Sequence, residues 1–298
     1  MEATDIFVEV FGRTDVGRQR EHNEDTFVVA NLDTGARTLG PSVRRHVLGP
    51  AGTLLAVCDG MGGASAGEVA SQIGADTLFE VMSRRPLADT IPTAVQRLGA
   101  AFQEANDRIA AAARRNLSRR GMGTTCSAAL LFGPRVLTAQ VGDSRVYVVR
   151  GDRIRQATRD QSLLNHLRET GHLKDEDLAD FQHANVILQA LGVVSTVQTE
   201  FGLVELCQGD RILVCSDGLT GVVEDEEIAD EVGGNRDLVT ACKRLTALAN
   251  ERGGPDNVTV VLAEVRGPGV PAERNGPLEV LRLDPRTGSP QGPLRTGP

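Results

Sequence analysis

Four aspartates border apolar, β-branched runs, and each lies next to glycine or asparagine in the chain. They are Asp59 in LLAVCDGMGG, Asp143 in TAQVGDSR, Asp217 in ILVCSDG and Asp256 in GGPDNVTVV. A carboxylate at the mouth of a buried strand is well placed to bind a hard cation. An adjacent glycine lets the backbone turn sharply and lets a metal, a water or a phosphate approach closely. The fourfold pattern therefore predicts strands whose ends meet in a carboxylate-lined metal site.

A fifth segment adds charged residues to this set. In RTDVGRQREHNEDTFVV, Arg20 precedes Glu24 by four residues, and Asp25 follows at once, before a strand-like run from Thr26 to Val29. Any one of these short motifs is more often an ordinary turn than a metal ligand, because Gly, Asp and Asn dominate turns. Their number and their shared strand context favour a functional site.

Six motifs follow one another in a characteristic order. They are R-x-x-x-E-D, D-G-M-G-G, G-M-G-T-T, G-D-S-R, S-D-G and G-x-D-N, and they lie between about Thr14 and Val265. In this order they resemble the protein phosphatase 2C family, the metal-dependent serine/threonine phosphatases, in its bacterial form. The resemblance covers nearly the whole chain outside a C-terminal tail.

Composition alone supports an α+β fold. The chain has 298 residues, of which 40% are hydrophobic, only 3% are aromatic and none is Trp, so its core must consist of Val, Ile, Leu and Ala. Stiff β-branched strands covered by alanine-rich helices suit such a core. The resemblance implies more, namely a four-layer α-β-β-α sandwich with two central, mainly antiparallel sheets flanked by helices.

The expected elements are spread evenly along the chain. Apolar residues repeat with helical spacing at 95–109 and 238–249 and more weakly at 69–73. The pairs Gly133-Pro134 and Gly151-Asp152 indicate hairpin turns. We expect strands at about residues 6–11, 26–31, 53–58, 124–131, 136–142, 145–150, 201–206, 211–215 and 258–265.

Residues 1–266 are expected to form one catalytic domain. Its segment at about 161–184 corresponds to a mobile flap beside the active site in the family, although a passive pair of surface helices is an equal alternative. Ser162 is placed to cap a short helix that ends at Glu169. Residues 32–52 connect two strands of a hairpin, so we expect a surface loop at the end remote from the metals.

The tail, residues 267–298, holds seven of the thirteen prolines and six glycines. Proline and glycine at that density prevent a helix and interrupt a strand ladder, so the tail is expected to be disordered. The apolar run from Leu278 to Leu283 leaves open a less favoured alternative, a docking strand or a linear motif.

The resemblance implies two tightly held divalent cations with oxygen ligands. Asp59 would bridge both ions, Gly60 would contribute its backbone carbonyl, and Asp217 and Asp256 would complete the more buried site. Asp143 would share a third, weakly held cation with Asp217. Oxygen-only ligation selects Mn²⁺ or Mg²⁺ over zinc or copper.

The resemblance also implies catalytic roles for Arg20, Glu24 and Asp59. Asp25 and Glu24 would hold the metal shell through ligation or ordered waters, and Arg20 would bind the phosphate oxygens with its planar guanidinium. Water activated between the two cations would then attack phosphorus without a phosphoenzyme intermediate. Met61 replaces a histidine found in many eukaryotic relatives, and a thioether cannot donate a proton, so the general acid is expected to be a water on the metals.

Charge and cysteine content limit the partners. The formal charge of −8 disfavours nucleic acid, whose phosphates an acidic surface repels. The five cysteines show no C-x-x-C spacing and lie in apolar runs or on a helix face, which predicts buried thiols and a reducing compartment. The N-terminus lacks a signal-like segment, and no window approaches ~18 consecutive apolar residues. We therefore expect a cytoplasmic protein that binds neither nucleic acid nor membranes.

The favoured hypothesis is a phosphatase that removes phosphate from phosphoserine and phosphothreonine on proteins. Its partners would be phosphorylated proteins, above all bacterial serine/threonine kinases and their substrates, whose action it would reverse. An alternative is a catalytically silent phosphoprotein-binding module of the same fold, but loss of a metal-binding aspartate would mark such a protein, and none is missing. A two-metal phosphodiesterase acting on nucleic acid is disfavoured by the acidic charge.

Overall fold

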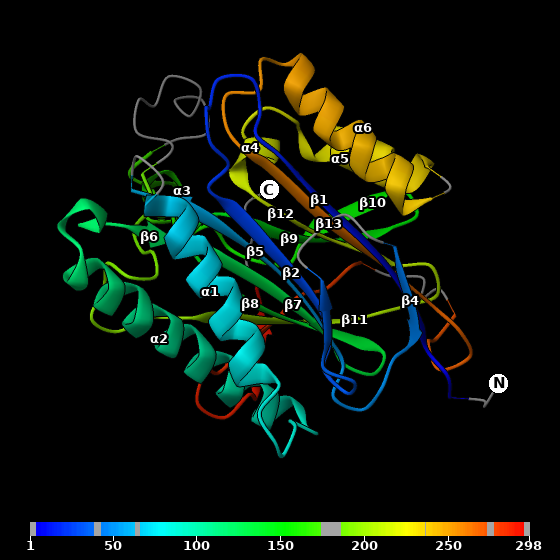
Figure 1. Ribbon diagram of the computed structural model, residues 1–298. Helices are drawn as coiled ribbons and strands as arrows, with labels where there is room; N and C mark the ends of the chain where they lie inside the picture. Colours follow the sequence, from blue (N-terminus) through cyan, green and yellow to red (C-terminus); the bar gives the residue numbers. More distant parts are fainter. Residues whose placement is uncertain are drawn as a thin grey trace.

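The computed structural model describes residues 4–38, 43–62, 66–173, 186–235, 237–272 and 277–294. These residues form two antiparallel sheets packed face to face, with helices on both outer sides (Figure 1). The four-layer sandwich implied by the family resemblance is confirmed. Within these ranges, no helix combines the length and the apolar character needed to cross a membrane.

Each sheet consists of strands from distant parts of the chain. The first sheet has the order β10 (Arg153–Gln156), β9 (Arg145–Arg150), β12 (Arg211–Cys215), β13 (Val258–Arg266), β1 (Phe7–Asp15) and β4 (Arg44–Val47). The second has the order β15 (Pro290–Pro293), β14 (Leu281–Leu283), β11 (Glu200–Glu205), β8 (Arg135–Val141), β7 (Cys126–Leu131), β5 (Thr53–Met61), β2 (Asp25–Asn31) and β3 (Ala36–Thr38), and β6 (Gly123–Thr124) pairs with β5.

Helices cover the outer face of each sheet (Figure 1). The long helices α1 (Ala66–Met82) and α2 (Ile91–Arg115) lie on the second sheet, and α5 (Asp225–Gly234) and α6 (Leu238–Glu251) lie on the first. Thr90 caps α2 by accepting a hydrogen bond from the backbone N–H of Thr93. The shorter helices are η1 (Leu117–Arg119), α3 (Leu163–Glu169) and α4 (Asp217–Thr220).

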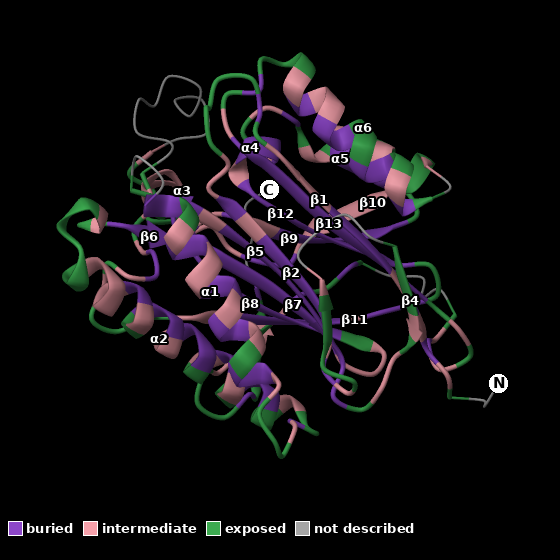
Figure 2. Cartoon of the chain, viewed as in Figure 1, coloured by how far each residue is buried: buried purple, intermediate pink, exposed green. Residues whose placement is uncertain are grey.

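Strand β5 shows why the sequences of the central strands are continuous apolar runs. Leu54 and Ala56 pack toward α1 and α2, whereas Leu55 and Val57 pack against the other sheet. Successive side chains of a strand point to opposite faces, so a strand buried on both faces needs apolar residues throughout. Figure 2 shows this burial continuing along the central strands of both sheets.

The register of β2 and β5 places two predicted site residues together. Asp25 lies directly opposite Asp59, and Asn31 lies opposite Thr53 at the other end of the pair. Residues 32–52 therefore connect the strands at the end remote from Asp59, as expected. They are not a plain loop, however, because β3 pairs with β2 and β4 pairs with β1 of the first sheet.

The expectation of a disordered tail is wrong for residues 277–294. Strand β14 pairs with β11, with Arg282 opposite Gly202, and β15 pairs with β14. Val280 and Leu294 are buried in the core between the sheets, and Leu283 is buried on the opposite face. These apolar side chains anchor a short hairpin despite the proline content around it, so the less favoured docking strand is the one observed.

The segment predicted as a flap, at about residues 161–184, is described only in its first half. Ser162 caps α3 by accepting a hydrogen bond from the backbone N–H of Asn165, and the helix ends at Glu169, as expected. The rest of the predicted flap, residues 174–184, lies outside the described residues.

Candidate functional site

The five predicted aspartates come from both sheets. Asp25 opens β2, Asp59 lies near the end of β5, and Asp143 lies in the turn that links β8 of one sheet to β9 of the other. Asp217 opens α4 directly after β12, and Asp256 precedes β13. Because β12 and β13 are paired and pack against β2 and β5, all five carboxylates lie at one end of the sandwich.

Burial and mutual repulsion perturb these carboxylates strongly. Burial raises the pKa of Asp25 to about 7, and the charges of Asp217 and Asp256 add to the increase. Burial likewise raises the pKa of Asp143 to about 7, with Asp217 as the next cause. The pKa of Asp59 is raised well above its usual range by burial and by the charges of Asp25 and Asp217. Each of these acids therefore lies within electrostatic reach of at least one other.

Several of these oxygens also lack hydrogen-bond partners. The charge of Asp217 is one cause of the raised pKa of Asp59, so the two carboxyls oppose each other's ionisation. Asp25 Oδ1 and Asp217 Oδ1 are buried without any partner. Buried unpaired acceptors are costly unless a proton, a water or a cation satisfies them.

The donor chemistry of the cluster fits a hard divalent cation, because every candidate ligand is an oxygen. Among the described residues, no three His, Cys, Asp or Glu side chains are arranged around a point where a metal could be held. Binding would therefore require the carboxylates to turn toward the ions.

Hydroxyl groups hold Asp25 and Asp59 in place. Asp25 Oδ2 accepts hydrogen bonds from Ser216 Oγ at 2.7 Å and from Thr259 Oγ1 at 2.6 Å. The backbone N–H of Asp59 donates to Thr125 Oγ1 at 3.0 Å, and Thr125 Oγ1 contacts Ser144 Oγ at 2.8 Å. Thr125 and Thr259 were not singled out in the sequence, although Thr125 lies in the G-M-G-T-T motif.

Glu24 contacts the start of α1. Its Oε1 accepts a hydrogen bond from the backbone N–H of Gly67 at 3.2 Å, and its backbone carbonyl accepts one from the N–H of Gly60 at 3.2 Å. A carboxylate at a helix N-terminus is favoured by the helix dipole. Glu24 thus joins the R-x-x-x-E-D segment to the D-G-M-G-G turn.

Asn257 ties the N-terminal loop to the site. Its Oδ1 accepts from the backbone N–H of Glu24 at 2.8 Å, and its Nδ2 donates to the carbonyls of Val16 and His22, both at 2.9 Å. The asparagine next to Asp256 therefore fixes the loop that carries Arg20. The turn residue predicted from G-x-D-N has a wider structural role than the sequence alone suggests.

Two glycines of the motifs are required by close packing. A Cβ on Gly60 would collide with the backbone carbonyls of Gly67 and Glu24, and a Cβ on Gly218 would collide with the carbonyl of Asn257. No side chain could be accommodated without moving backbone atoms. These glycines allow the two aspartate-bearing turns to approach their neighbours closely.

Arg20 contacts one of the predicted metal ligands. Its Nη2 lies 2.7 Å from Asp256 Oδ2, and 51% of its side chain is exposed. The sequence placed this guanidinium on phosphate, whereas here it is paired with a carboxylate. Its position at the rim of the cluster nevertheless leaves the group within reach of an anion bound there.

Sequence comparison identifies the family. The family described as Protein phosphatase 2C matches residues 44–262. The "Serine/threonine phosphatase stp" of Listeria welshimeri is 35% identical over 253 residues, which cover 85% of this chain and 94% of that protein.

Solved structures give the same result. The structure of the Mycobacterium tuberculosis serine/threonine phosphatase PstP/Ppp has a TM-score of 0.73 and 33% identity, and covers 88% of this chain and 100% of that one. The catalytic domain of PstP in complex with two manganese ions has a TM-score of 0.70 and 34% identity, with the same coverage.

Proposed function

Because the chain belongs to the protein phosphatase 2C family, we propose that it hydrolyses phosphoserine and phosphothreonine on proteins with the help of two divalent cations. The phosphatases named among its relatives support the activity, and the two manganese ions of the PstP structure support the cofactor. Phosphorylated kinases and their substrates are the partners that such an activity would serve.

The observation that carries this proposal is the cluster of buried acids at one end of the sandwich, in which Asp25 lies directly opposite Asp59 and Asp217 Oδ1 has no hydrogen-bond partner. Such a cluster cannot be fully ionised at neutral pH without cations to balance it. Acids with this degree of perturbation are common at functional sites. Dications bound among these carboxylates would offset their mutual repulsion and so stabilise the arrangement.

The chain offers ligands for each ion. Asp59 would serve both cations, the carbonyl of Gly60 would add a neutral ligand, and Asp217 and Asp256 would complete the set. Asp143, whose pKa is raised by burial and then by the charge of Asp217, would hold a third and weaker ion. When bound, the two main cations would lower the pKa of a water and balance the charge that develops on the phosphoryl oxygens.

Other side chains position these groups. Ser216 and Thr259 orient Asp25, and Glu24 fixes the backbone of Gly60 against α1. Arg20 would bind the phosphate of the substrate through its guanidinium, since metal binding by Asp256 would free it from its present partner.

The proposed function is tested with three substrates and Mn²⁺. We expect hydrolysis of p-nitrophenyl phosphate and of a phosphothreonine peptide, and no significant hydrolysis of bis-p-nitrophenyl phosphate. Activity confined to the diester would identify a phosphodiesterase. No activity on any of the three in the presence of Mn²⁺ would favour a silent binding module.

Replacing Arg20 with Ala is expected to raise KM for phosphosubstrates by roughly tenfold or more, because a charge-assisted hydrogen bond contributes about 1.5–3 kcal/mol. The affinity for Mn²⁺ should not fall, since Arg20 and the metal compete for Asp256. Steady-state kinetics and calorimetric metal titration measure the two effects separately. Arg18→Ala in the same exposed loop is the matched control. Weakened metal binding with an unchanged KM would show that Arg20 supports the metal site instead.

A further inference from the structure

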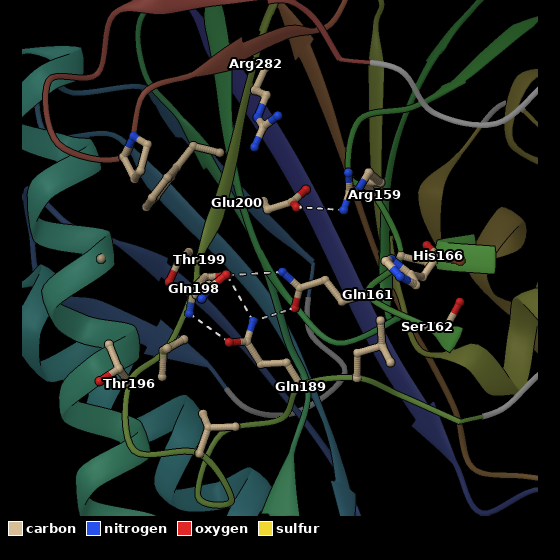
Figure 3. A pocket seen from close by; sticks show the side chains of 17 residues that line it. Arg159, Gln161, Ser162, His166, Gln189, Thr196, Gln198, Thr199, Glu200 and Arg282 are labelled. Atoms are coloured by element: carbon tan, nitrogen blue, oxygen red, sulfur yellow. Dashed lines mark hydrogen bonds and ion pairs between the residues drawn. The ribbon is translucent and has the colours of Figure 1, made fainter. Parts of the chain in front are cut away.

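A cavity lies near the carboxylate cluster. Its volume is about 700 Å³, and it is enclosed by the start of the flap, the segment 188–199, strand β11 and the C-terminal hairpin. Figure 3 shows its polar side chains converging from these segments. Those used below are Arg159, Gln161, Gln189, Gln198, Glu200 and Arg282.

Two buried polar atoms in this cavity have no hydrogen-bond partner. Glu200 Oε1 lies 3.2 Å from Arg159 Nη2, but Glu200 Oε2 and Arg159 Nε are buried without hydrogen-bond partners. Burial raises the pKa of Glu200. Arg282 is exposed at the edge of the cavity, its guanidinium points toward Glu200 in Figure 3, and its charge acts to lower the pKa of that carboxyl. Unsatisfied donors and acceptors that face one cavity indicate a missing polar ligand.

The glutamines line one wall of the cavity, and their side chains already have hydrogen-bond partners. Gln189 Nε2 donates to Gln161 Oε1 at 2.9 Å and to the Gln198 carbonyl at 3.0 Å, and Gln189 Oε1 accepts from the Gln198 N–H at 2.8 Å. These bonds fix the shape of the cavity. Charge recognition is left to Arg282 and to the free oxygen of Glu200, because Arg159 already pairs with Glu169 at 3.3 Å and with Glu200 at 3.2 Å.

Hydrogen bonds join the wall of the cavity to the turn that carries Asp143. The backbone N–H of Gln161 donates to the Gly142 carbonyl at 2.9 Å, and Gln161 Oε1 accepts from the Gly142 N–H at 3.0 Å. Glu200 lies opposite Gln140, three residues before Asp143. At ~3.3 Å per residue, the cavity begins roughly 10 Å from Asp143.

Arg282 reaches the cavity because of the C-terminal hairpin. It lies opposite Gly202, two residues along β11 from Glu200, so both side chains are on the same face of the sheet. The buried side chains of Val280 and Leu283 hold the strand in this register. The hairpin lies beyond residues 44–262, which the family match covers.

We propose that this cavity binds an acidic side chain of the phosphoprotein substrate, three to five residues from the phosphorylated one, an inference that rests on the proposed function. A peptide residue spans at most ~3.6 Å, so about three residues cover the distance from the active site. Arg282 pairs with the carboxylate, and Glu200 Oε2 accepts a main-chain N–H of the peptide. A chain of net charge −8 repels acidic peptides overall, so a local arginine is needed to hold one.

The test uses phosphothreonine peptides with a single Asp, or Asn in its place, three to five residues before or after the phosphothreonine. At one or more positions, the Asp peptide is expected to have a kcat/KM about three- to fivefold higher, the size of an ion pair with an exposed arginine. The difference should lie in KM and should shrink at high ionic strength.

Arg282→Gln is expected to remove this preference while p-nitrophenyl phosphate, which cannot reach the cavity, is hydrolysed at the wild-type rate. Arg286→Gln is the matched control, because Arg286 is exposed on the same hairpin but does not line the cavity. Equal rates for all Asp and Asn peptides, or a preference that survives Arg282→Gln, would overturn the proposal. If no peptide is hydrolysed although p-nitrophenyl phosphate is, the proposed protein substrate itself is wrong, and the accessory site with it.

Discussion

Removal of divalent cations with EDTA is expected to abolish phosphatase activity, and addition of Mn²⁺ or Mg²⁺ is expected to restore it. The physical reason is the oxygen-only cluster of buried acids, which needs dications both for chemistry and for charge balance. The same addition should raise Tm. A ligand present at about 100 times its Kd stabilises a folded protein by about 2.7 kcal/mol.

Circular dichroism of the EDTA-treated protein is the control, because the loss of activity must be separated from unfolding. We expect native secondary structure without metal, since the three hydrophobic clusters lie within the sandwich and do not depend on the ions. Full activity in chelated, metal-free buffer would contradict the mechanism. Unchanged Tm on addition of Mn²⁺ would contradict the proposed binding site.

The central strands could be predicted because consecutive residues along them are apolar. A strand such as β5 or β13 is buried on both faces, so its β-branched run is visible without knowledge of its neighbours. The C-terminal hairpin could not be predicted in this way. Its strand β14 has only three residues, and its stability comes from pairing with β11 and from the burial of Val280 and Leu283, which local composition does not reveal.

The acidic residues of the candidate site could be predicted from the sequence, but the residues that hold them in place could not. Four of the aspartates recur beside glycine or asparagine in a fixed order, which is a local signal. The contacts of Thr259 with Asp25 and of Asn257 with Glu24 join residues more than 230 positions apart. Only the paired sheets bring them together. The pairing of Arg20 with Asp256 is likewise a tertiary contact, and it places the proposed phosphate ligand beside a proposed metal ligand.

Asp59→Asn is expected to reduce kcat/KM by more than about a hundredfold, which exceeds the usual effect of replacing a group outside the ligand set. The substitution preserves shape but removes the charge proposed to serve both cations. In the metal-free protein the same substitution should be stabilising. Asp59 has a raised pKa because burial and the charges of Asp25 and Asp217 oppose its ionisation. An amide removes that opposition, so the metal-free variant should melt at a higher temperature than the metal-free wild type.

The sign of the pH dependence follows from the direction of the pKa shift. A carboxyl whose pKa is higher in the folded than in the unfolded state makes the protein less stable as pH rises above its ordinary value. The gain in Tm from Asp59→Asn should therefore be larger at pH 8 than at pH 5, and Mn²⁺ should remove it by stabilising only the wild type fully.

Asp210→Asn is the matched control, because Asp210 is also buried but is paired with Arg150 at 2.7 Å. Loss of that charge leaves a buried guanidinium without its counter-ion and should lower Tm. A metal-free Asp59→Asn protein that melts below the wild type would show that the carboxylate stabilises the fold, and one that retains more than a few per cent of activity would show that Asp59 is not a metal ligand.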